Sequence, residues 1–417
     1  DGDEEHGARG GRHASRPGAS VIGRGDGRPI ALVPTRYGND VVGGSEAVMR
    51  EAALGLSERG WPVEVLTTCA RDHYTWRNVY PAGSHQIDGI TVRRFPTVQD
   101  VARREHESLS LRVQAGERLP FDEQLAWINS GFRVPGLYQH LLGERQRYRA
   151  VIFSPYLFWT TVTCAAIDPE RTIVMPCLHD EVYAYLDLVQ EALGSAAALW
   201  FLSEPEHALA HRIATVPDDH VVTGAGVHVP DAYDPAGFRE RFGVAGRFIV
   251  YAGRRESGKG WDHLLHAFAE AVRRYDLPLD LVTIGAGTVS VPPSIKGRVH
   301  DLGFLDDRDR DNALAAAEVY VQPSANESFS RTIMESWLAG TPVIGSAASE
   351  VVAWHCERSE GGLVYRDTFE LAQALMLLAE RPEVAERLAR SGRAYVLREY
   401  QWPAVLDRME ASLERFG

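Results

Sequence analysis

The chain has 417 residues, a length that favours two or three domains. Its formal net charge of −13 argues against a nucleic-acid partner, because contact with a phosphate backbone needs a basic surface. No apolar run is long enough to span a membrane, no signal peptide is expected, and the four cysteines are scattered without a C-x-x-C pair. These features predict a cytoplasmic protein, and peripheral contact with the inner face of the membrane stays open.

The first half of the chain predicts a tail followed by an α/β domain. Residues 1–28 mix glycine, arginine and acidic residues with almost no apolar content, which is typical of a disordered tail. Residues 29–228 open with a β-loop-α-β pattern, in which helical spacing from Ser45 to Arg59 lies between two apolar runs. Residues 97–148 are charged and helical in pattern, and they fit an inserted element or ordinary helical packing over the sheet equally well. The strands expected here are 30–34, 62–68, 91–95, 150–154, 171–175, 199–203 and 220–223.

A second βα series follows a loop-like linker at residues 227–246. It predicts a second domain over residues 229–399, and residues 400–417 add a last helix. Strands are expected at 248–253, 279–287, 319–323, 342–345 and 362–365, and helices at 261–275, 367–380, 383–398 and 402–416. We therefore expect an α/β fold with two doubly wound, Rossmann-like domains that face each other across a cleft. Ligands of such sheets bind beyond the carboxyl ends of the strands.

The turn after the strand at 248–253 is a candidate anion site. Its sequence, Y-A-G-R-R-E-S-G-K-G, places Arg254 and Lys259 in a glycine-bearing turn before a helix. A helix N-terminus favours phosphate, arginine binds it with two hydrogen bonds, and lysine adds a point charge. Lys259 is one of only two lysines in the chain, with Lys296. The alternative is a solvated basic turn, and a Walker A loop is excluded because G-x-x-x-x-G-K-[ST] is absent.

A glycine pair in the first domain is the second anion candidate. V-V-G-G-S-E spans residues 41–46, and Gly43 and Gly44 let backbone N–H groups approach a ligand closely. Ser45 is the expected N-cap of the following helix. Such a pair is often only a turn, but this one would face the Arg254 and Lys259 turn across the cleft.

Two glutamates eight positions apart follow the strand at 319–323. Glu327 lies in a strand-to-helix loop, and Glu335 lies about two turns into the helix. Carboxylates accept hydrogen bonds from paired hydroxyls, so a sugar and a ribose are natural ligands for this pair.

These motifs together resemble a known family. P-S-A-N-E-S-F-S-R-T-I-M-E-S-W-L-A-G-T-P-V-I resembles the Glu-x7-Glu signature of the retaining, nucleotide-sugar-dependent glycosyltransferases of the family 4 type, which have the GT-B fold. G-R-R-E-S-G-K-G is similar to their phosphate-binding loop, G-G-S-E to their N-domain glycine loop, and V-T-I-G-A-G and D-L-G-F-L-D-D to their donor-domain turns. The resemblance covers most of residues 29–417 and is strongest over 248–365. It implies an acceptor-side domain at 29–228, a nucleotide-sugar domain at 229–399, and a last helix that crosses back to the first domain.

The resemblance also implies a role for each matching residue. Arg254 and Lys259 would bind the donor diphosphate, Glu327 the sugar hydroxyls and Glu335 the ribose. His179, in C-L-H-D after a strand, would lie beside the reacting sugar. The implied substrate-binding set is completed by Gly43, Gly44, Ser45, Asp180 and Gly253, by Gly285, Phe304 and Leu305 near the base, and by the backbone of Ser328, Phe329 and Ser330.

Two stretches depart from the family pattern. Ser330 and Arg331 stand where the family often has a glycine and an apolar residue. V-T-G-A-G-V-H, residues 222–228, lacks the usual P-N-G form. Both departures concern the donor side of the expected cleft.

The implied reaction transfers a hexose-type sugar from a UDP- or GDP-sugar with retained configuration, without a metal or another cofactor. Glycan, lipid-linked and small-molecule acceptors all stay open, and the acceptor is expected against residues 97–135 and Asp180–Tyr185. Glu206-His207-x3-His211 is interpreted as a solvated helix face, because H-E-x-x-H is absent. The rival hypotheses are a nucleotide-sugar 2-epimerase of the same fold and a sugar-nucleotide-binding protein without turnover.

Overall fold

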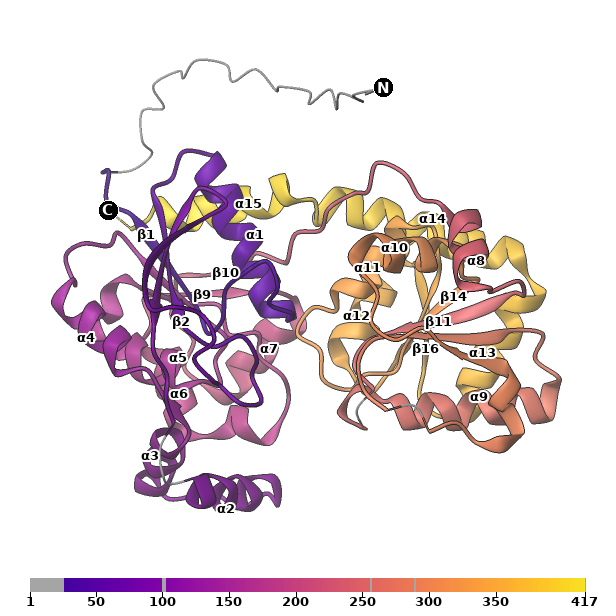
Figure 1. Cartoon of the computed structure of the whole chain (residues 1–417), viewed down its shortest axis with the longest axis horizontal. Helices are drawn as coiled ribbons and strands as arrows, with labels where there is room; N and C mark the ends of the chain where they lie inside the picture. Colours follow the sequence, from indigo (N-terminus) through magenta and orange to yellow (C-terminus); the bar gives the residue numbers. More distant parts are fainter. Residues whose placement is uncertain (1–25, 100–102, 256, 289, 417) are drawn as a thin grey trace, which may run out of the picture.

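The computed structural model describes residues 26–99, 103–255, 257–288 and 290–416. Two α/β domains lie side by side, and the last two helices of the chain lead from the C-terminal domain back onto the N-terminal one (Figure 1). The predicted fold class is therefore confirmed: each domain has its own parallel sheet with helices on both faces. The tail expected at residues 1–28 lies almost wholly outside the described residues.

The N-terminal domain is built on an eight-stranded sheet in the order β10-β9-β8-β7-β1-β2-β4-β3. Its strands are β1 (Ile30–Pro34), β2 (Val63–Thr68), β3 (Gly83–Ile87), β4 (Ile90–Phe95), β7 (Val151–Ser154), β8 (Thr172–Val174), β9 (Ala198–Phe201) and β10 (His220–Val222). All neighbours are parallel except β3 and β4. The predictions did not include β3, because its G-S-H-Q-I sequence is mostly polar and exposed. The turn into β4 uses positive φ at both Asp88 and Gly89, the conformation of a tight hairpin.

Seven helices surround this sheet in the part of the domain that the structure describes. They are α1 (Gly44–Glu58), α2 (Arg103–Gln114), α3 (Phe121–Ser130), α4 (Pro135–Gly143), α5 (Trp159–Cys164), α6 (Asp187–Ser195) and α7 (Glu204–Ile213). Figure 1 shows α2 and α3 projecting from the lower end of the domain, whereas α4 lies against its side. Residues 97–148 thus form both an inserted element, with α2 and α3, and ordinary helical packing, with α4. A short ribbon of β5 (Val98–Gln99) and β6 (Phe132–Arg133) closes the projecting part.

The C-terminal domain has a six-stranded, fully parallel sheet in the order β13-β12-β11-β14-β15-β16. Its strands are β11 (Phe248–Ala252), β12 (Asp280–Ile284), β13 (Val299–Asp301), β14 (Val319–Gln322), β15 (Val343–Ser346) and β16 (Gly362–Tyr365). Its helices are α8 (Pro235–Phe242), α9 (Trp261–Tyr275), α10 (Asp307–Ala316), α11 (Arg331–Leu338), α12 (Glu350–Ser359), α13 (Thr368–Glu380) and α14 (Pro382–Glu399). The expected linker at 227–246 contains α8, so the prediction of a loop there was only partly right.

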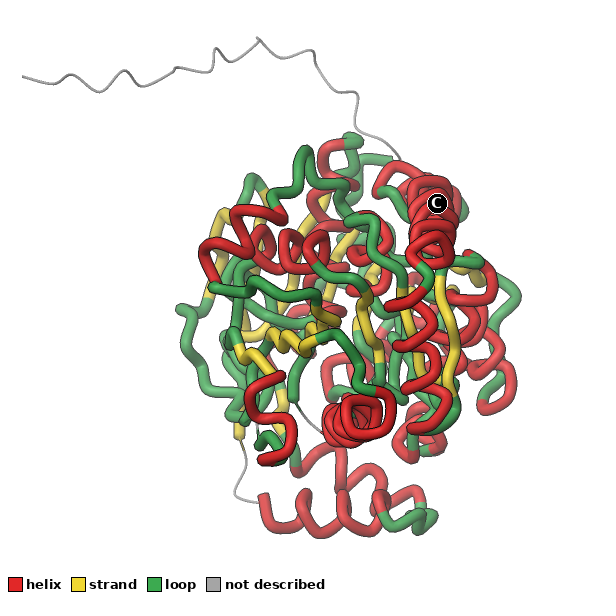
Figure 2. The backbone as a smooth tube through the Cα atoms, turned by 90° about the vertical axis from the view of Figure 1, so that its right-hand side faces the viewer, coloured by secondary structure: helices red, strands yellow, loops and turns green. Residues whose placement is uncertain are grey.

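The last helix, α15 (Trp402–Leu413), packs on the N-terminal domain although it follows the C-terminal one. Trp61 and Trp200 donate their indole N–H groups to Glu410 and Ser412 of this helix, at 2.8 and 2.9 Å. Gly55 of α1 makes room for it, because a Cβ there would lie 2.6 Å from Leu406. In Figure 2, turned by 90°, α15 is seen nearly end-on beside the body of the molecule. No helix among the described residues is long and apolar enough to cross a membrane.

Candidate active site

The sheet order of the C-terminal domain creates a topological switch point. Strand β11 lies between β12 and β14, so the chain leaves it towards one edge of the sheet and later returns on its other side. The loops after β11 and β14, residues 253–260 and 323–330, therefore flank a crevice at the carboxyl ends of the strands, which is where ligands of such sheets bind. Lys259 and Glu327 come from these two loops, and Lys259 Nζ lies 2.8 Å from Glu327 Oε1. The structure thus brings together two of the predicted residues, 68 positions apart.

Glycines allow these loops to approach one another. Gly260, at φ +71°, precedes α9, and a Cβ there would lie 2.2 Å from the carbonyl oxygen of Pro323. Gly285, at φ +135°, would place a Cβ 2.1 Å from the carbonyl oxygen of Gly253. Any side chain at either position would push the turns apart, so these two glycines hold the turns that form the site together.

Arg254 and Arg255 have opposite environments. Arg254 is exposed, and its Nη1 lies 3.3 Å from both His73 Nε2 and Tyr74 Oη of the N-terminal domain. Arg255 is buried, donates to the carbonyl oxygens of Gly285 and Gly287 at 2.6 and 3.1 Å, and pairs with Asp301. The predicted ligand-binding residue Arg254 is therefore the one at the interdomain surface, while Arg255 orders the neighbouring turn.

Glu335 lies on α11 and pairs with Arg310 of α10, with 3.2 Å between Arg310 Nη2 and Glu335 Oε1. The sequence predictions missed Arg310. Asp311 follows Arg310 in the sequence, and burial raises the pKa of its carboxyl to about 6. The negative charge of Glu335 adds to this rise. A ribose at Glu335 would therefore share this carboxylate with an arginine.

The residues expected around the base and sugar differ in exposure. Phe304 is 66% exposed, whereas Leu305 is partly buried against the core. Phe329 is 3% exposed and packs edge-on against His355 and Tyr400, so its side chain belongs to the core and only its backbone faces the loop. Ser330 has φ +65°, in the left-handed region that favours glycine, and Gln322 Nε2 donates to its hydroxyl at 2.6 Å.

The loop after β8 carries the side chains of the N-terminal domain that lie opposite Lys259. His179 Nδ1 lies 3.5 Å from Glu181 Oε1, and the Tyr156 hydroxyl donates to the same carboxylate oxygen at 2.6 Å. Burial raises the pKa of the Glu181 carboxyl. Three effects lower it: the hydrogen bonds from His179 and Tyr156, and the positive charge of Lys259. Together they outweigh the effect of burial, so the pKa of Glu181 lies below its ordinary value. The sequence predictions missed Tyr156, and they included Glu181 only within the Asp180–Tyr185 segment expected against the acceptor.

Two further side chains on α7 hold this loop. The buried Glu206 accepts the backbone N–H of Leu178 at 2.6 Å, directly before His179. Asp180 is exposed and is engaged by the Tyr185 hydroxyl at 2.7 Å and by Arg212 at 3.3 Å. Arg212 also lies 3.5 Å from Glu350 of the C-terminal domain. The predicted substrate residue Asp180 therefore belongs to a salt-bridge network that reaches the C-terminal domain through Arg212.

The glycine pair Gly43–Gly44 lies over a buried ion pair. Arg36 Nη2 contacts Glu46 Oε1 at 2.6 Å, and a Cβ on Gly43 would lie 2.1 Å from the Glu46 carboxylate. Gly44 has nothing near its missing Cβ and faces open space. Ser45 donates to Glu46 at 2.9 Å and lies inside α1, so its expected N-cap role is wrong: Gly43 occupies that position.

Glu51 of α1 joins three segments near the crossover. Its carboxylate accepts from Trp402 Nε1 at 2.7 Å and lies 3.3 Å from Arg331 and 3.4 Å from His228. The hydrogen bond that His228 donates to the Glu51 carboxylate raises the pKa of His228 above its ordinary value. Arg331, one of the departures from the family pattern, therefore has a structural explanation as a bridge between the domains.

We expect Glu51→Gln to lower the Tm of the full chain, because it removes the charge that three donors share at a site only 11% exposed. Loss of a charge-assisted hydrogen bond costs about 1.5–3 kcal/mol, and each kcal/mol lowers Tm by about 2–4 °C in domains of this size. Calorimetry on Glu51→Gln, Arg331→Leu and the double variant measures the coupling. Glu58→Gln, at an exposed glutamate of the same helix, is the control. Strictly additive effects of the two substitutions would contradict the proposed bridge.

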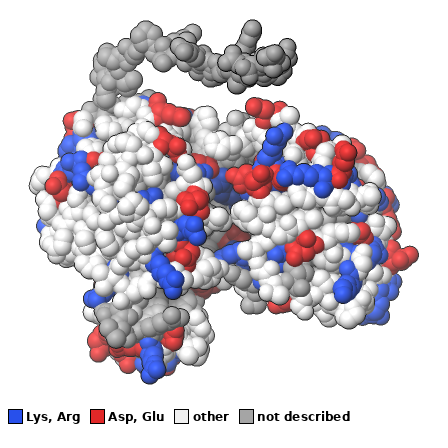
Figure 3. Space-filling view, viewed as in Figure 1, with Lys and Arg blue, Asp and Glu red and all other residues white. Residues whose placement is uncertain are grey.

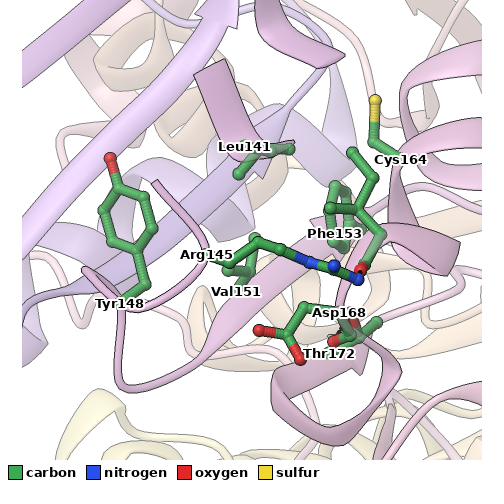
Figure 4. Close-up of a pocket in the computed structure, with 9 residues that line it drawn as sticks. Leu141, Arg145, Tyr148, Val151, Phe153, Cys164, Asp168 and Thr172 are labelled. Carbon is green, nitrogen blue, oxygen red and sulfur yellow. Dashed lines mark hydrogen bonds between the residues drawn. The ribbon is translucent and has the colours of Figure 1, made fainter. Parts of the chain in front are cut away.

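A hollow separates the two domains, and lysine and arginine side chains line parts of it (Figure 3). A second hollow of about 410 Å³ lies between the α2–α3 projection and the segment that follows His179. It is lined by Val113, Gly116, Glu117, Arg118, Gln124, Val182, Tyr185, Leu186 and Gln190. All of them except Leu186 and Gln190 come from the two segments expected to hold an acceptor, residues 97–135 and Asp180–Tyr185. The cavity in Figure 4, between Leu141, Arg145 and Asp168, measures about 10 Å³ and holds at most about one water molecule.

Comparison with known proteins agrees with this geometry. Residues 246–381 match the family model described as "Glycosyl transferases group 1". MMP alpha-(1->4)-mannosyltransferase of Mycolicibacterium hassiacum is 32% identical over 209 residues, which cover 47% of this chain and 50% of the relative. 2-Deoxystreptamine glucosyltransferase of Streptomyces kanamyceticus is 27% identical over 60% of this chain and 73% of the relative. The matches span only about half the length of the first curated relatives.

The fold has solved counterparts over nearly the whole chain. HepE of Anabaena, in complex with UDP and glucose, superposes with a TM-score of 0.67 at 16% identity, over 93% of this chain and 99% of that one. Sucrose-phosphate synthase of Thermosynechococcus elongatus gives 0.67 at 17% identity, over 93% and 98%. The chain has the GT-B fold, and its residues 246–381 match the group 1 glycosyltransferase model. The resemblance predicted from the Glu-x7-Glu segment is thereby confirmed.

Proposed function

We propose that the protein is a retaining glycosyltransferase that moves a hexose-type sugar from a nucleoside-diphosphate sugar to an acceptor. The observation that carries the proposal is the Lys259–Glu327 pair at the switch point, opposite His179 and Glu181 of the other domain. A cation for a diphosphate and a carboxylate for sugar hydroxyls meet where such a sheet binds ligands. The glycosyltransferase relatives support the same class of reaction.

Donor binding would give Lys259 and Glu327 new partners. With no donor, Glu327 neutralises Lys259 across 2.8 Å. A diphosphate carries more charge than one carboxylate and would take over Lys259, which frees Glu327 to accept hydrogen bonds from sugar hydroxyls. Arg254 would close over the diphosphate from the opposite side, and α11, which begins directly after the Glu327 loop, would add the positive end of its dipole.

The transfer step then needs stabilisation of the leaving group. The bond between the anomeric carbon and the β-phosphate oxygen breaks, and its electron pair stays on that oxygen. The acceptor hydroxyl attacks from the same face, and its proton passes to the departing phosphate oxygen, so the configuration is retained. Lys259, Arg254 and backbone N–H groups would stabilise the developing charge. No side chain acts as a nucleophile in this scheme, and closure of the two domains would exclude water.

We place the acceptor in the hollow of about 410 Å³ beside α2 and α3, since its residues adjoin the His179 loop. The relatives act, by their names, on acceptors as different as D-inositol 3-phosphate, phosphatidyl-myo-inositol and 2-deoxystreptamine. Sugar phosphates, lipid-linked acceptors and small aglycones therefore form the first panel to test. The lipid-linked members would require peripheral contact of the protein with a membrane.

We expect transfer to continue in EDTA, because the proposed charge stabilisation uses only side chains and N–H groups. The measurement is product formation from UDP- and GDP-sugars with the acceptor panel, and the anomeric configuration of the product is read by NMR. Loss of activity in EDTA that Mg²⁺ or Mn²⁺ restores, or an inverted product, would contradict the mechanism. A sugar epimerised without an acceptor would identify a 2-epimerase instead, and binding without any turnover would identify a binding protein.

A further inference from the structure

Three histidines gather on the N-terminal domain at the outer edge of its sheet. His207 and His211 lie four positions apart on α7, which puts them on one face of the helix, and His220 opens the edge strand β10. One ring nitrogen from each histidine lies within 4.8 Å of those of the other two. The sequence suggested only the first two residues, as a solvated helix face. Residues 214–219 connect α7 to β10 and so bring the third histidine, His220, beside the first two.

The spacing of the rings fits coordination of a metal ion. Zn–N bonds of about 2.0–2.1 Å in a tetrahedral site put two ligating nitrogens about 3.3 Å apart. The Nε2 atoms of His207 and His211 are 2.9 Å apart, and the three ring centroids are separated by 4.6, 4.8 and 5.6 Å. Small rotations of the side chains would therefore bring all three nitrogens to a common ion.

Outer hydrogen bonds prepare two of the rings as ligands. His220 Nδ1 lies 2.8 Å from the carbonyl oxygen of Pro217, and His207 Nδ1 lies 3.5 Å from Glu204 Oε2. When the proton of a neutral imidazole lies on Nδ1, Nε2 is unprotonated and its lone pair can bind a metal ion.

We propose that His207, His211 and His220 form a binding site for a zinc-class divalent metal ion. His211 is exposed, so the fourth position is open to water. The ion would link α7 to the edge strand β10. Because α7 also carries Glu206 and Arg212, which hold the His179 loop and reach Glu350, this link would stiffen this side of the interdomain surface. It takes no part in sugar transfer.

The test uses the full chain without an affinity tag, stripped with EDTA and dialysed free of it. Calorimetric titration with ZnCl₂ is expected to show one ion per chain, and His207→Ala, His211→Ala and His220→Ala should each weaken binding at least about tenfold. His266→Ala, at an exposed histidine of α9, should bind like the wild type. Co²⁺ should give the visible absorption of a tetrahedral site in the wild type and lose it in His211→Ala. Zn²⁺ should raise the Tm of the wild type and not that of His211→Ala.

His211 lies at the surface, so its variant is expected to fold, and circular dichroism verifies this. No Zn²⁺ binding by the wild type would overturn the proposal. Binding that survives unchanged in the folded His211→Ala variant would do the same, since it would show that other groups hold the ion.

Discussion

Lys259→Ala is expected to lower kcat/KM for sugar transfer about 10²- to 10³-fold, which corresponds to ~3–4 kcal/mol of lost transition-state stabilisation. The physical reason is that Lys259 is a cation at the switch point, where negative charge would grow on the departing diphosphate in the proposed reaction. The substitution also leaves the Glu327 carboxylate, 15% exposed, without its partner at 2.8 Å. Donor binding should therefore weaken together with turnover.

The chain offers a matched control for this variant. Lys296 is the only other lysine, and it lies exposed in the turn before β13. Lys296→Ala makes the same chemical change and should leave transfer and nucleotide binding at wild-type values. Equal activity of the two variants, with both proteins folded, would exclude Lys259 from the diphosphate site.

Glu327→Gln is expected to separate sugar recognition from nucleotide recognition. The amide keeps the size of the side chain but accepts weaker hydrogen bonds from sugar hydroxyls, so transfer should fall about 10²-fold or more. Binding of the bare nucleoside diphosphate should stay within about threefold of the wild type, because Lys259 remains and loses only a competing partner. Initial rates and calorimetric titrations of the same preparation measure the two effects.

Glu318→Gln is the control for this second variant. Glu318 directly precedes β14, at the opposite end of the strand that leads to Glu327, and it too pairs with a cation, Arg247, at 3.2 Å. Its substitution should change neither rate nor binding. A parallel loss of transfer and nucleotide affinity in Glu327→Gln would contradict the assignment of this glutamate to the sugar.

Local patterns sufficed to predict much of the fold. The expected helix at 261–275 coincides with α9. Gly260 marks its start, and its apolar positions recur at helical spacing. The polar hairpin strand β3 and helix α8 were not predicted, since neither has a strong apolar pattern. Their existence depends on pairing with β4 and on packing against α10, which no local pattern reveals.

The site was predictable only where a motif marks it. Lys259 and Glu327 were named because their turns have a recognisable sequence, and the structure places them in contact. Arg310 and Tyr156 were missed and Glu181 was given no role of its own, because each reaches the site through the tertiary arrangement of separate elements. His220 was missed for the same reason.

The departures from the family pattern have separate physical explanations. Ser330 adopts the left-handed conformation in which glycine is favoured, and the hydrogen bond from Gln322 partly offsets the strain. Arg331 exchanges an apolar contact for an ion pair with Glu51 of the other domain. Both residues follow the Glu327 loop, so this chain joins its donor-side loop to the interdomain surface by polar contacts.

Calorimetric titration of the wild type and of Lys259→Ala with UDP, GDP, ADP and dTDP, in EDTA, tests the central claim most directly. The account predicts that the wild type binds one of these nucleotides selectively and that Lys259→Ala loses at least tenfold in affinity for it, while Lys296→Ala does not. Selective binding would also identify the base of the donor. Binding of none of the four, or equal binding by all three proteins, would contradict the assignment of a diphosphate to the switch point.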